Sequence, residues 1–195
     1  LQYDNTMHFV VTNLNDPIVS YDNRTNFVDK MIINPYSDRT CPCGRRGCVE
    51  SELTPSATMS KLKEVFSAEK TPFLYEAASG SFENVNQDMI TMAYEKDDKA
   101  VKEILNGELT LLAVLLNNLY FSTNPQKIVL HQFKFQNEKA FQKLKDAVTE
   151  IGGALVSSKI ELSIIEDKHR FLSGCALAIR ELFFNRGGFD TSSNN

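Results

Sequence analysis

The sequence predicts an α/β fold in which a mixed sheet is flanked by helices, with a helical insertion after a cysteine-rich loop. Three observations lead to this prediction. Short β-branched runs open the chain, a long apolar helix lies at its centre, and strands alternate with helices in the second half. The chain has 195 residues, which suits one domain or two small lobes and is enough for a substantial core.

The opening segment predicts an antiparallel meander. Strand-like runs occupy residues 8–14, 18–21 and 27–33, and turn-rich residues such as Asn15, Asp16 and Pro17 separate them. Meander strands pair with their neighbours in sequence, so this segment is expected to give the sheet its antiparallel members.

The middle of the chain predicts helices. Residues 55–70 and 85–96 have helical periodicity, so we expect a helical insert over residues 51–96. Residues 97–121 predict a long helix that is buried around much of its circumference, because its apolar residues recur at spacings of three, four and seven. These residues are Val101, Ile104, Leu105, Leu112, Leu115, Leu116 and Leu119. A leucine-rich stripe of this kind usually forms core or a subunit interface.

The second half predicts a strand–helix–strand–helix order. The strands are expected at residues 127–131 and 159–165, and the helices at residues 138–151 and 171–184. The alternation indicates a layered α/β sheet, to which the opening meander adds antiparallel members. Residues 186–195 are expected to form a flexible tail.

Composition narrows the class of protein. Hydrophobic residues make up 42% of the chain and charged residues 24%, which is typical of a globular protein, and the net charge of −4 does not favour binding to phosphate backbones. The longest uncharged stretch, residues 109–126, holds too many polar residues to span a bilayer, and no signal peptide is recognisable. We therefore expect a cytoplasmic protein without a membrane partner.

The strand-like start without Met indicates a fragment of a longer protein.

The cysteine loop is the clearest chemical motif. Residues 41–50 read CPCGRRGCVE, which places Cys41, Cys43 and Cys48 within eight residues with glycines at the turns. Three thiolates on such a knuckle can occupy three corners of a zinc tetrahedron. The alternative is three reduced cysteines in a tight loop. Cys175 stands alone in an apolar helical context and is expected to be inert.

The loop resembles the C-x-C-G-x-x-G-C-x-E signature of the ROK family, which joins bacterial sugar kinases to sugar-responsive transcriptional repressors. Residues 124–130 (NPQKIVL) and 173–178 (SGCALA) resemble two further family segments, so the resemblance covers nearly the whole chain. It implies that residues 1–195 form the C-terminal lobe of an actin-like, ribonuclease-H-like fold. The N-terminal lobe, with its phosphate loop and catalytic Asp, would lie upstream.

Two departures from the family pattern argue against nucleotide binding. Kinases of the family carry a glycine-rich run after the first strand of this lobe, whereas residues 11–17 read VTNLNDP. Asp16 and Pro17 would put a negative charge and a missing amide donor where an anion should bind. A second glycine cluster is expected after I-V-L, where this chain has His131, Gln132 and Phe133. We therefore expect no ATP and no enzyme activity.

The family's sugar-contacting segment is also altered. Its E-x-G-H motif, aligned on Pro35, puts Phe27, Asp29 and Lys30 at the Glu, Gly and His positions, so the family's zinc histidine is absent. A zinc ion would need its fourth ligand from elsewhere, for example Asp29, His8 or water, and the alternative is a knuckle without metal. Glu50 matches the family Glu that hydrogen-bonds sugar hydroxyls, although a carboxylate at a helix start also suits the helix dipole.

Two histidines and two arginines are the other polar residues that could serve a site. His131 has no Ser or Cys partner nearby in sequence and His169 lies in a charged loop, so neither is expected to be catalytic. Arg45 and Arg46 could contact an anion at the knuckle but could equally be solvated.

The resemblance and the departures together imply a ligand-sensing and dimerisation domain of a ROK-type transcriptional regulator, a repressor of carbohydrate-utilisation genes. Its partners would be a sugar or sugar-derivative inducer, a second copy of itself, and DNA only through an N-terminal domain absent from this chain. Two alternatives stay open: the C-terminal lobe of a glucokinase-like sugar kinase, and a degenerate scaffold that regulates through dimer or protein contacts.

Overall fold

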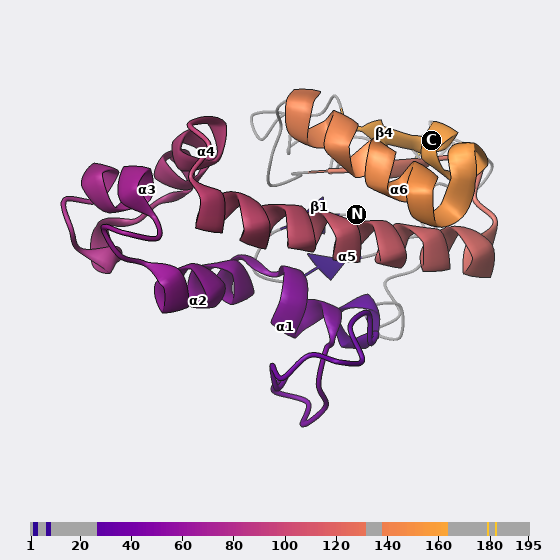
Figure 1. The fold of residues 1–195 in the computed structure, drawn as a ribbon. Coiled ribbons are helices and arrows are strands. Elements are labelled where there is room, and N and C mark those ends of the chain that lie inside the picture. Colours follow the sequence, from indigo (N-terminus) through magenta and orange to yellow (C-terminus); the bar gives the residue numbers. More distant parts are fainter. Residues whose placement is uncertain are drawn as a thin grey trace, which may run out of the picture.

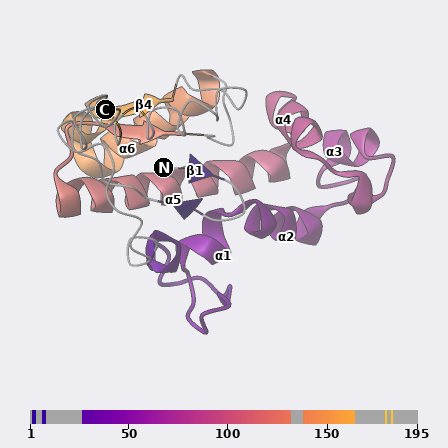
Figure 2. The same cartoon turned by 180° about the vertical axis from the view of Figure 1, so that it is seen from behind.

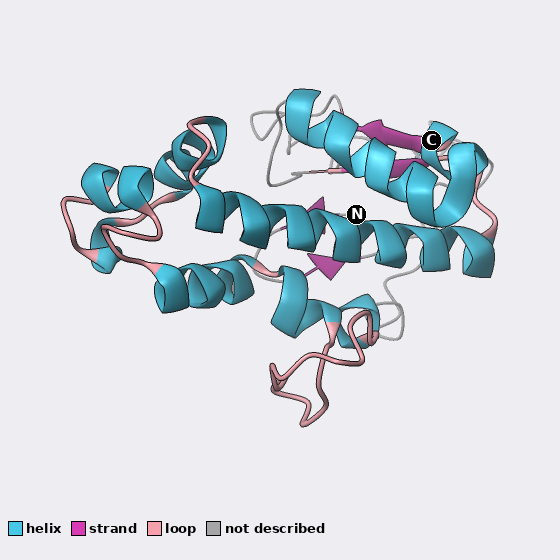
Figure 3. Cartoon of the chain, in the orientation of Figure 1, coloured by secondary structure: helices cyan, strands magenta, loops and turns pink. Residues whose placement is uncertain are grey.

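The computed structural model describes residues 2–3, 7–8, 27–131 and 138–163, together with residues 179 and 182. Helices dominate this part of the chain, with two short strand pairs beside them (Figure 3). In chain order the elements are β1 (Gln2–Tyr3), β2 (Met7–His8), the 3-10 helix η1 (Phe27–Lys30), α1 (Val49–Leu53), α2 (Pro55–Val65), α3 (Pro72–Ala77), the 3-10 helix η2 (Phe82–Asn84), α4 (Gln87–Glu95), α5 (Lys99–Thr123), β3 (Ile128–Leu130), α6 (Glu138–Ser158) and β4 (Ile160–Leu162).

Helix α5 is the centre of the fold and confirms the long helix expected at residues 97–121. It crosses the molecule between α1 and α2 on one side and α6 with its strands on the other, and two opposite views agree on this arrangement (Figures 1 and 2). Ten of its residues are buried, among them Leu105, Leu115 and Leu116. The helix ends where Asn124 takes the left-handed conformation, which closes a helix without a further turn.

The length and composition of α5 would also allow it to cross a bilayer. However, 50% of its most apolar stretch is buried against the rest of the protein. Core helices of globular proteins have this property.

The predicted strand–helix–strand unit is confirmed for β3, α6 and β4. β3 and β4 pair in parallel, with Ile128 opposite Ile160 and Leu130 opposite Leu162. Ile128 and Leu130 are buried while Val129 between them is 45% exposed, as expected for alternating strand residues. α6 runs beyond the predicted residue 151 to Ser158, with non-helical backbone at Gly153.

The region between the cysteine loop and α5 is helical, as expected. α2 begins at Pro55 because Thr54 caps it, its Oγ1 accepting a hydrogen bond from the Ala57 N–H at 3.3 Å. α4 begins after Asn86, whose Oδ1 accepts from the Met89 N–H at 3.0 Å. α2 ends five residues earlier than the predicted 70, and α3 was not predicted because its six residues are too few to show a period.

Two expectations differ from the structure, and several others concern residues outside the described part of the chain. The strand predicted at residues 27–33 is wrong: residues 27–30 form η1, and only Ile32 makes a bridge, to Cys48. The mixed sheet is not seen as one sheet in the described residues, where an antiparallel pair (β1–β2) and a parallel pair (β3–β4) stand apart. Residues 9–26, Cys175, His169, the tail and most of the helix expected at 171–184 lie outside the described residues.

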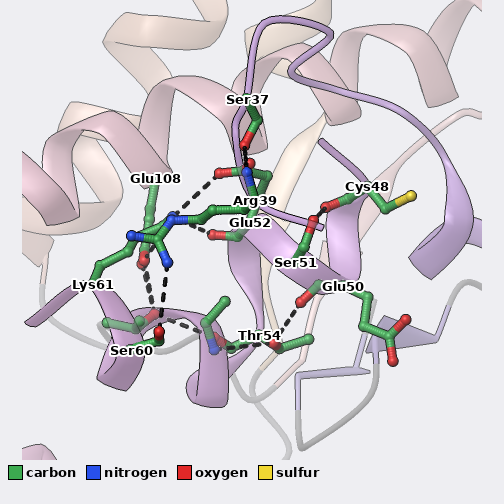
Figure 4. Close-up of polar contacts among 12 residues, drawn as sticks. Ser37, Arg39, Cys48, Glu50, Ser51, Glu52, Thr54, Ser60, Lys61 and Glu108 are labelled. Carbon is green, nitrogen blue, oxygen red and sulfur yellow. Dashed lines mark hydrogen bonds and ion pairs between the residues drawn. The ribbon is translucent and has the colours of Figure 1, made fainter. Parts of the chain in front are cut away.

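A buried ionic cluster fastens α1 and α2 to α5 (Figure 4). Both carboxylate oxygens of Glu108 accept from the Thr58 hydroxyl, at 2.8 and 2.9 Å, and Lys61 Nζ lies 3.3 Å from Glu108 Oε1. Lys61 also lies 3.4 Å from Glu52 Oε2 and donates to the Glu52 carbonyl at 2.6 Å. Glu52 and Glu108 are 3% and 5% exposed, so the ammonium of Lys61 compensates two buried carboxylates.

Candidate metal-binding and ligand-binding site

The cysteine loop folds back on itself as a short knuckle between η1 and α1. Backbone bridges join Thr40 to Arg46 and Ile32 to Cys48, and the amide of Cys41 donates to the Arg45 carbonyl at 2.8 Å. Gly47 permits this fold because its φ is +68° and an added Cβ would lie 1.7 Å from the Asn34 carbonyl oxygen. The loop backbone therefore packs directly on the segment that follows η1.

The knuckle brings the three predicted thiols together. The Sγ atoms of Cys41, Cys43 and Cys48 all lie within 4.8 Å of one another. Cys43 Sγ and Cys48 Sγ are 3.6 Å apart, close to the edge of about 3.8 Å that a zinc–sulfur tetrahedron requires. Cys41 and Cys48 are buried and Cys43 is exposed. The residues present therefore fit three corners of a zinc site.

The environment of the thiols differs from one to the next. Contact with the Arg45 side chain and backbone lowers the pKa of Cys43 to about 6, whereas burial raises the pKa of Cys41 to about 12 and also raises that of Cys48. Arg45 additionally donates to the Lys30 carbonyl at 3.0 Å. Of the two arginines considered as anion contacts, Arg45 thus supports the loop itself.

Glu50 lies beside the thiols as the second residue of α1. Its Oε2 accepts a hydrogen bond from Cys41 Sγ at 3.1 Å and pairs with the Lys30 ammonium. The Lys30 hydrogen bond, followed by that from Cys41, lowers the pKa of Glu50. No described residue donates to Oε1, and the carboxylate points away from the ionic cluster of Glu52 and Glu108 (Figure 4). Within the described part of the chain, one carboxylate oxygen is therefore held by two partners and the other has none.

Asp29, one of the three sources considered for a fourth ligand, does not lie with the thiols in this arrangement. Asp29 Oδ2 pairs with Lys30 Nζ at 3.1 Å, and among the described residues no His, Asp or Glu has a ligand atom within 4.8 Å of all three thiols. Lys30, at the position of the family's histidine, instead connects Asp29 with Glu50, and these contacts raise its pKa. The side chain of His8 lies outside the description.

Sequence reasoning missed a contact between His131 and Ser163. Nδ1 of His131 lies 3.1 Å from Ser163 Oγ, although the two residues are 32 positions apart. Each residue directly follows a strand, and β3 and β4 pair in parallel with Leu130 opposite Leu162. The matching lengths of IVL and IEL were the signal that could have predicted it, because residues that follow paired parallel strands emerge at the same edge.

Comparisons of the sequence and of the structure with known proteins point to the same family, the ROK family. The sequence profile of the ROK family matches residues 30–169, which is well over half of the chain. No curated protein matches the sequence. Among solved structures, a ROK family transcriptional regulator described as a homologue of the E. coli MLC protein is 17% identical with a TM-score of 0.50, over 68% of this chain and 32% of its own.

Two kinases of the family are also similar in structure. A ROK family glucokinase from Streptomyces griseus, in complex with glucose and AMPPNP, is 16% identical (TM-score 0.48; 65% of this chain, 39% of its own). A ROK hexokinase from Thermus thermophilus is 15% identical (TM-score 0.47; 65% and 37%). The chain thus spans about a third to two fifths of the length of these proteins. The regulator and the family match imply the expected actin-like ATPase fold, and the chain belongs to the ROK family.

Proposed function

We propose that this chain is the ligand-sensing and dimerisation domain of a ROK-type transcriptional regulator, and that it does not transfer phosphate. In this proposal residues 1–195 form the C-terminal lobe and residues 51–96 are its helical insert. The second lobe and a DNA-binding domain come from outside this chain. The protein acts in the cytoplasm as a homodimer.

The observation that carries this proposal is the His131–Ser163 contact. Ligands of open α/β sheets bind at the carboxyl ends of parallel strands, and phosphates there are held by backbone amides that glycines leave accessible. At that edge this chain has an imidazole, 3.1 Å from a serine hydroxyl on the neighbouring strand end. A side chain of this size, where the kinases of the family have glycine, obstructs the approach of a phosphate.

Glu50 is the residue we propose for the sugar contact. A carboxylate accepts hydrogen bonds well from sugar hydroxyls, and Oε1 is the oxygen that the described residues leave open. Lys30 and Cys41 hold Oε2, so the carboxylate is oriented before a ligand arrives. Preorganisation of this kind reduces the entropy lost on binding.

Cys41, Cys43 and Cys48 would hold a structural zinc ion. A bound zinc would supply a rigid cross-link and no reaction chemistry. Because Cys48 bridges Ile32 and immediately precedes α1, the cross-link would fix both the segment after η1 and the start of the helix that carries Glu50. The inducer would then favour one of two dimer states that differ in DNA affinity.

The test is a thermal shift on the complete gene product with hexoses, amino sugars, sugar phosphates and Mg-ATP, alongside an assay for hexose phosphorylation. A ligand that binds only the native state raises the melting temperature. We expect a shift with a sugar, no shift with Mg-ATP and no hexose phosphate. Glu50→Gln should remove the sugar shift, while Glu95→Gln, an exposed carboxylate at the end of α4, should retain it.

Two outcomes would overturn the proposal. A Mg-ATP shift together with hexose phosphate formation would identify a kinase. No shift with any small molecule would favour the scaffold, an alternative that has its own support because Lys30 already pairs with the carboxylate that should receive the sugar.

A further inference from the structure

Cys43 and Cys48 form a thiol pair of unequal exposure. Cys48 is fully buried, at 0% exposure, and Cys41 is 2% exposed, whereas Cys43 lies at the exposed tip of the knuckle. An oxidant arriving from solvent therefore meets the Cys43 sulfur first. Selectivity among cysteines follows exposure as well as thiolate character.

The second thiol of the pair is within reach. Cys43 Sγ and Cys48 Sγ are 3.6 Å apart, and a disulfide needs about 2.0 Å, so the two sulfurs must approach by about 1.6 Å in total. The third thiol also lies within 4.8 Å of the other two, but it has a carboxylate partner, because Cys41 Sγ donates to Glu50 Oε2 at 3.1 Å. The geometry thus separates one exposed attacking sulfur, one buried resolving sulfur, and one sulfur held by a carboxylate.

From this arrangement we propose that Cys43 is a site of oxidative modification by hydroperoxides and that Cys48 is its resolving thiol. The Cys43 sulfur attacks the terminal oxygen of the hydroperoxide, the O–O bond breaks, an alcohol or water leaves, and Cys43 becomes a sulfenic acid. The Cys48 sulfur then attacks the Cys43 sulfur, the S–S bond forms, the S–O bond breaks and water leaves. Two thiols are oxidised and one peroxide is reduced.

The modification would act on the knuckle as a whole. It removes two of the three thiols that fit a metal, so a zinc-loaded knuckle would release one zinc ion per disulfide formed. Cys48 also bridges Ile32 and is the N-cap residue of α1, so the disulfide would form at the start of the helix that carries Glu50. This inference depends neither on sugar binding nor on DNA binding.

The experiment treats the metal-free protein with an equimolar amount of hydrogen peroxide and maps its cysteines by alkylation, proteolysis and mass spectrometry. A Cys175→Ser background removes the one cysteine outside the described residues. We expect a Cys43–Cys48 cross-link that a dithiol reductant reverses. A cross-link that involves Cys41, or the absence of any cross-link, would overturn the proposal.

Variants separate the two roles. Cys48→Ser should accumulate a sulfenic acid at Cys43 that a dimedone probe traps. In Cys43→Ser, hydrogen peroxide should oxidise the remaining thiols at least about tenfold more slowly than in the parent. Cys41→Ser is the matched control and should still form the cross-link. Circular dichroism of each variant before oxidation establishes that the fold is retained, and equal oxidation rates for folded Cys43→Ser and the parent would contradict the assignment.

Discussion

The thiol of Cys41 donates a hydrogen bond to Oε2 of Glu50 at 3.1 Å, and this oxygen also pairs with Lys30. The contact joins the cysteine knuckle to the proposed sugar-binding carboxylate through a single atom. Any change in the knuckle that moves Cys41 therefore changes the environment of Glu50.

Replacing Lys30 by Met should destabilise the protein in a pH-dependent way. Because Lys30 lowers the pKa of Glu50, the resulting stability is present above the unfolded pKa of about 4.3 and is lost as pH falls through the folded pKa. Urea unfolding should show a loss of at most about 1 kcal/mol at pH 7, and this loss should disappear in acid once Glu50 is protonated in the folded protein. Lys127→Met, which breaks the exposed pair with Glu161, is the control.

Removing metal should destabilise the wild type more than a ligand variant. If zinc is bound, Cys43→Ser removes one thiolate and weakens the site, so a chelator should lower the melting temperature of the wild type and hardly affect the variant. The metal content of both proteins, measured by mass spectrometry, accompanies the melts. An equal response of the two proteins to the chelator would exclude a stabilising metal at these thiols.

Alanine at Gly47 should disrupt the knuckle, whereas alanine at Gly44 should be tolerated. Both glycines have positive φ, but an added Cβ at Gly47 meets the Asn34 backbone while that at Gly44 meets nothing within 4 Å. We expect a cost of about 1 kcal/mol for Gly44→Ala from φ alone, and of about 3 kcal/mol or more for Gly47→Ala. Urea unfolding measures both, and similar costs would show that the close approach to Asn34 does not matter.

Removing Lys61 should be among the most destabilising changes of a charged residue. Lys61→Met leaves Glu52 and Glu108 buried without their cation, which costs about 3–5 kcal/mol. Lys61→Met combined with Glu108→Gln should recover part of the loss, because the amide oxygen can still accept from Thr58. Lys99→Met is the matched control, since Lys99 is 88% exposed, and a similar effect of both lysine variants on chemical unfolding would refute the role of the cluster.

Periodicity predicted α5 and α6 well because their signals are long. α5 extends over 25 residues and α6 over 21, so their apolar spacings repeat enough times to identify a helix. The error at residues 27–33 has the opposite origin. A run such as FVDKMII is too short to distinguish a strand from a 3-10 turn, and here the pairing of Ile32 with Cys48 decides the backbone.

The sequence was enough to predict which residues could bind a metal, but not which side chains contact one another across the fold. The spacing of Cys41, Cys43 and Cys48 suffices to place three thiols together, because the loop that joins them is short. The ion pair of Lys30 with Glu50 and the contact of His131 with Ser163 join residues 20 and 32 positions apart. The first contact depends on how η1 packs against α1, which nothing local in the sequence encodes, while the second follows only once β3 and β4 are known to pair in register.

The absence of a spacer between the knuckle and α1 limits how the chain can vary in length. Cys48 is the N-cap residue, Val49 is the first helical residue and Glu50 the second. A helix turns by about 100° per residue, so one residue inserted after Cys48 would rotate Glu50 to another side of the helix while the thiols stayed in place. Insertions at the loop tip, between Pro42 and Gly44, would leave that angular relationship intact. The number of residues between Cys48 and Glu50 must therefore stay constant if the carboxylate is to keep its direction relative to the thiols.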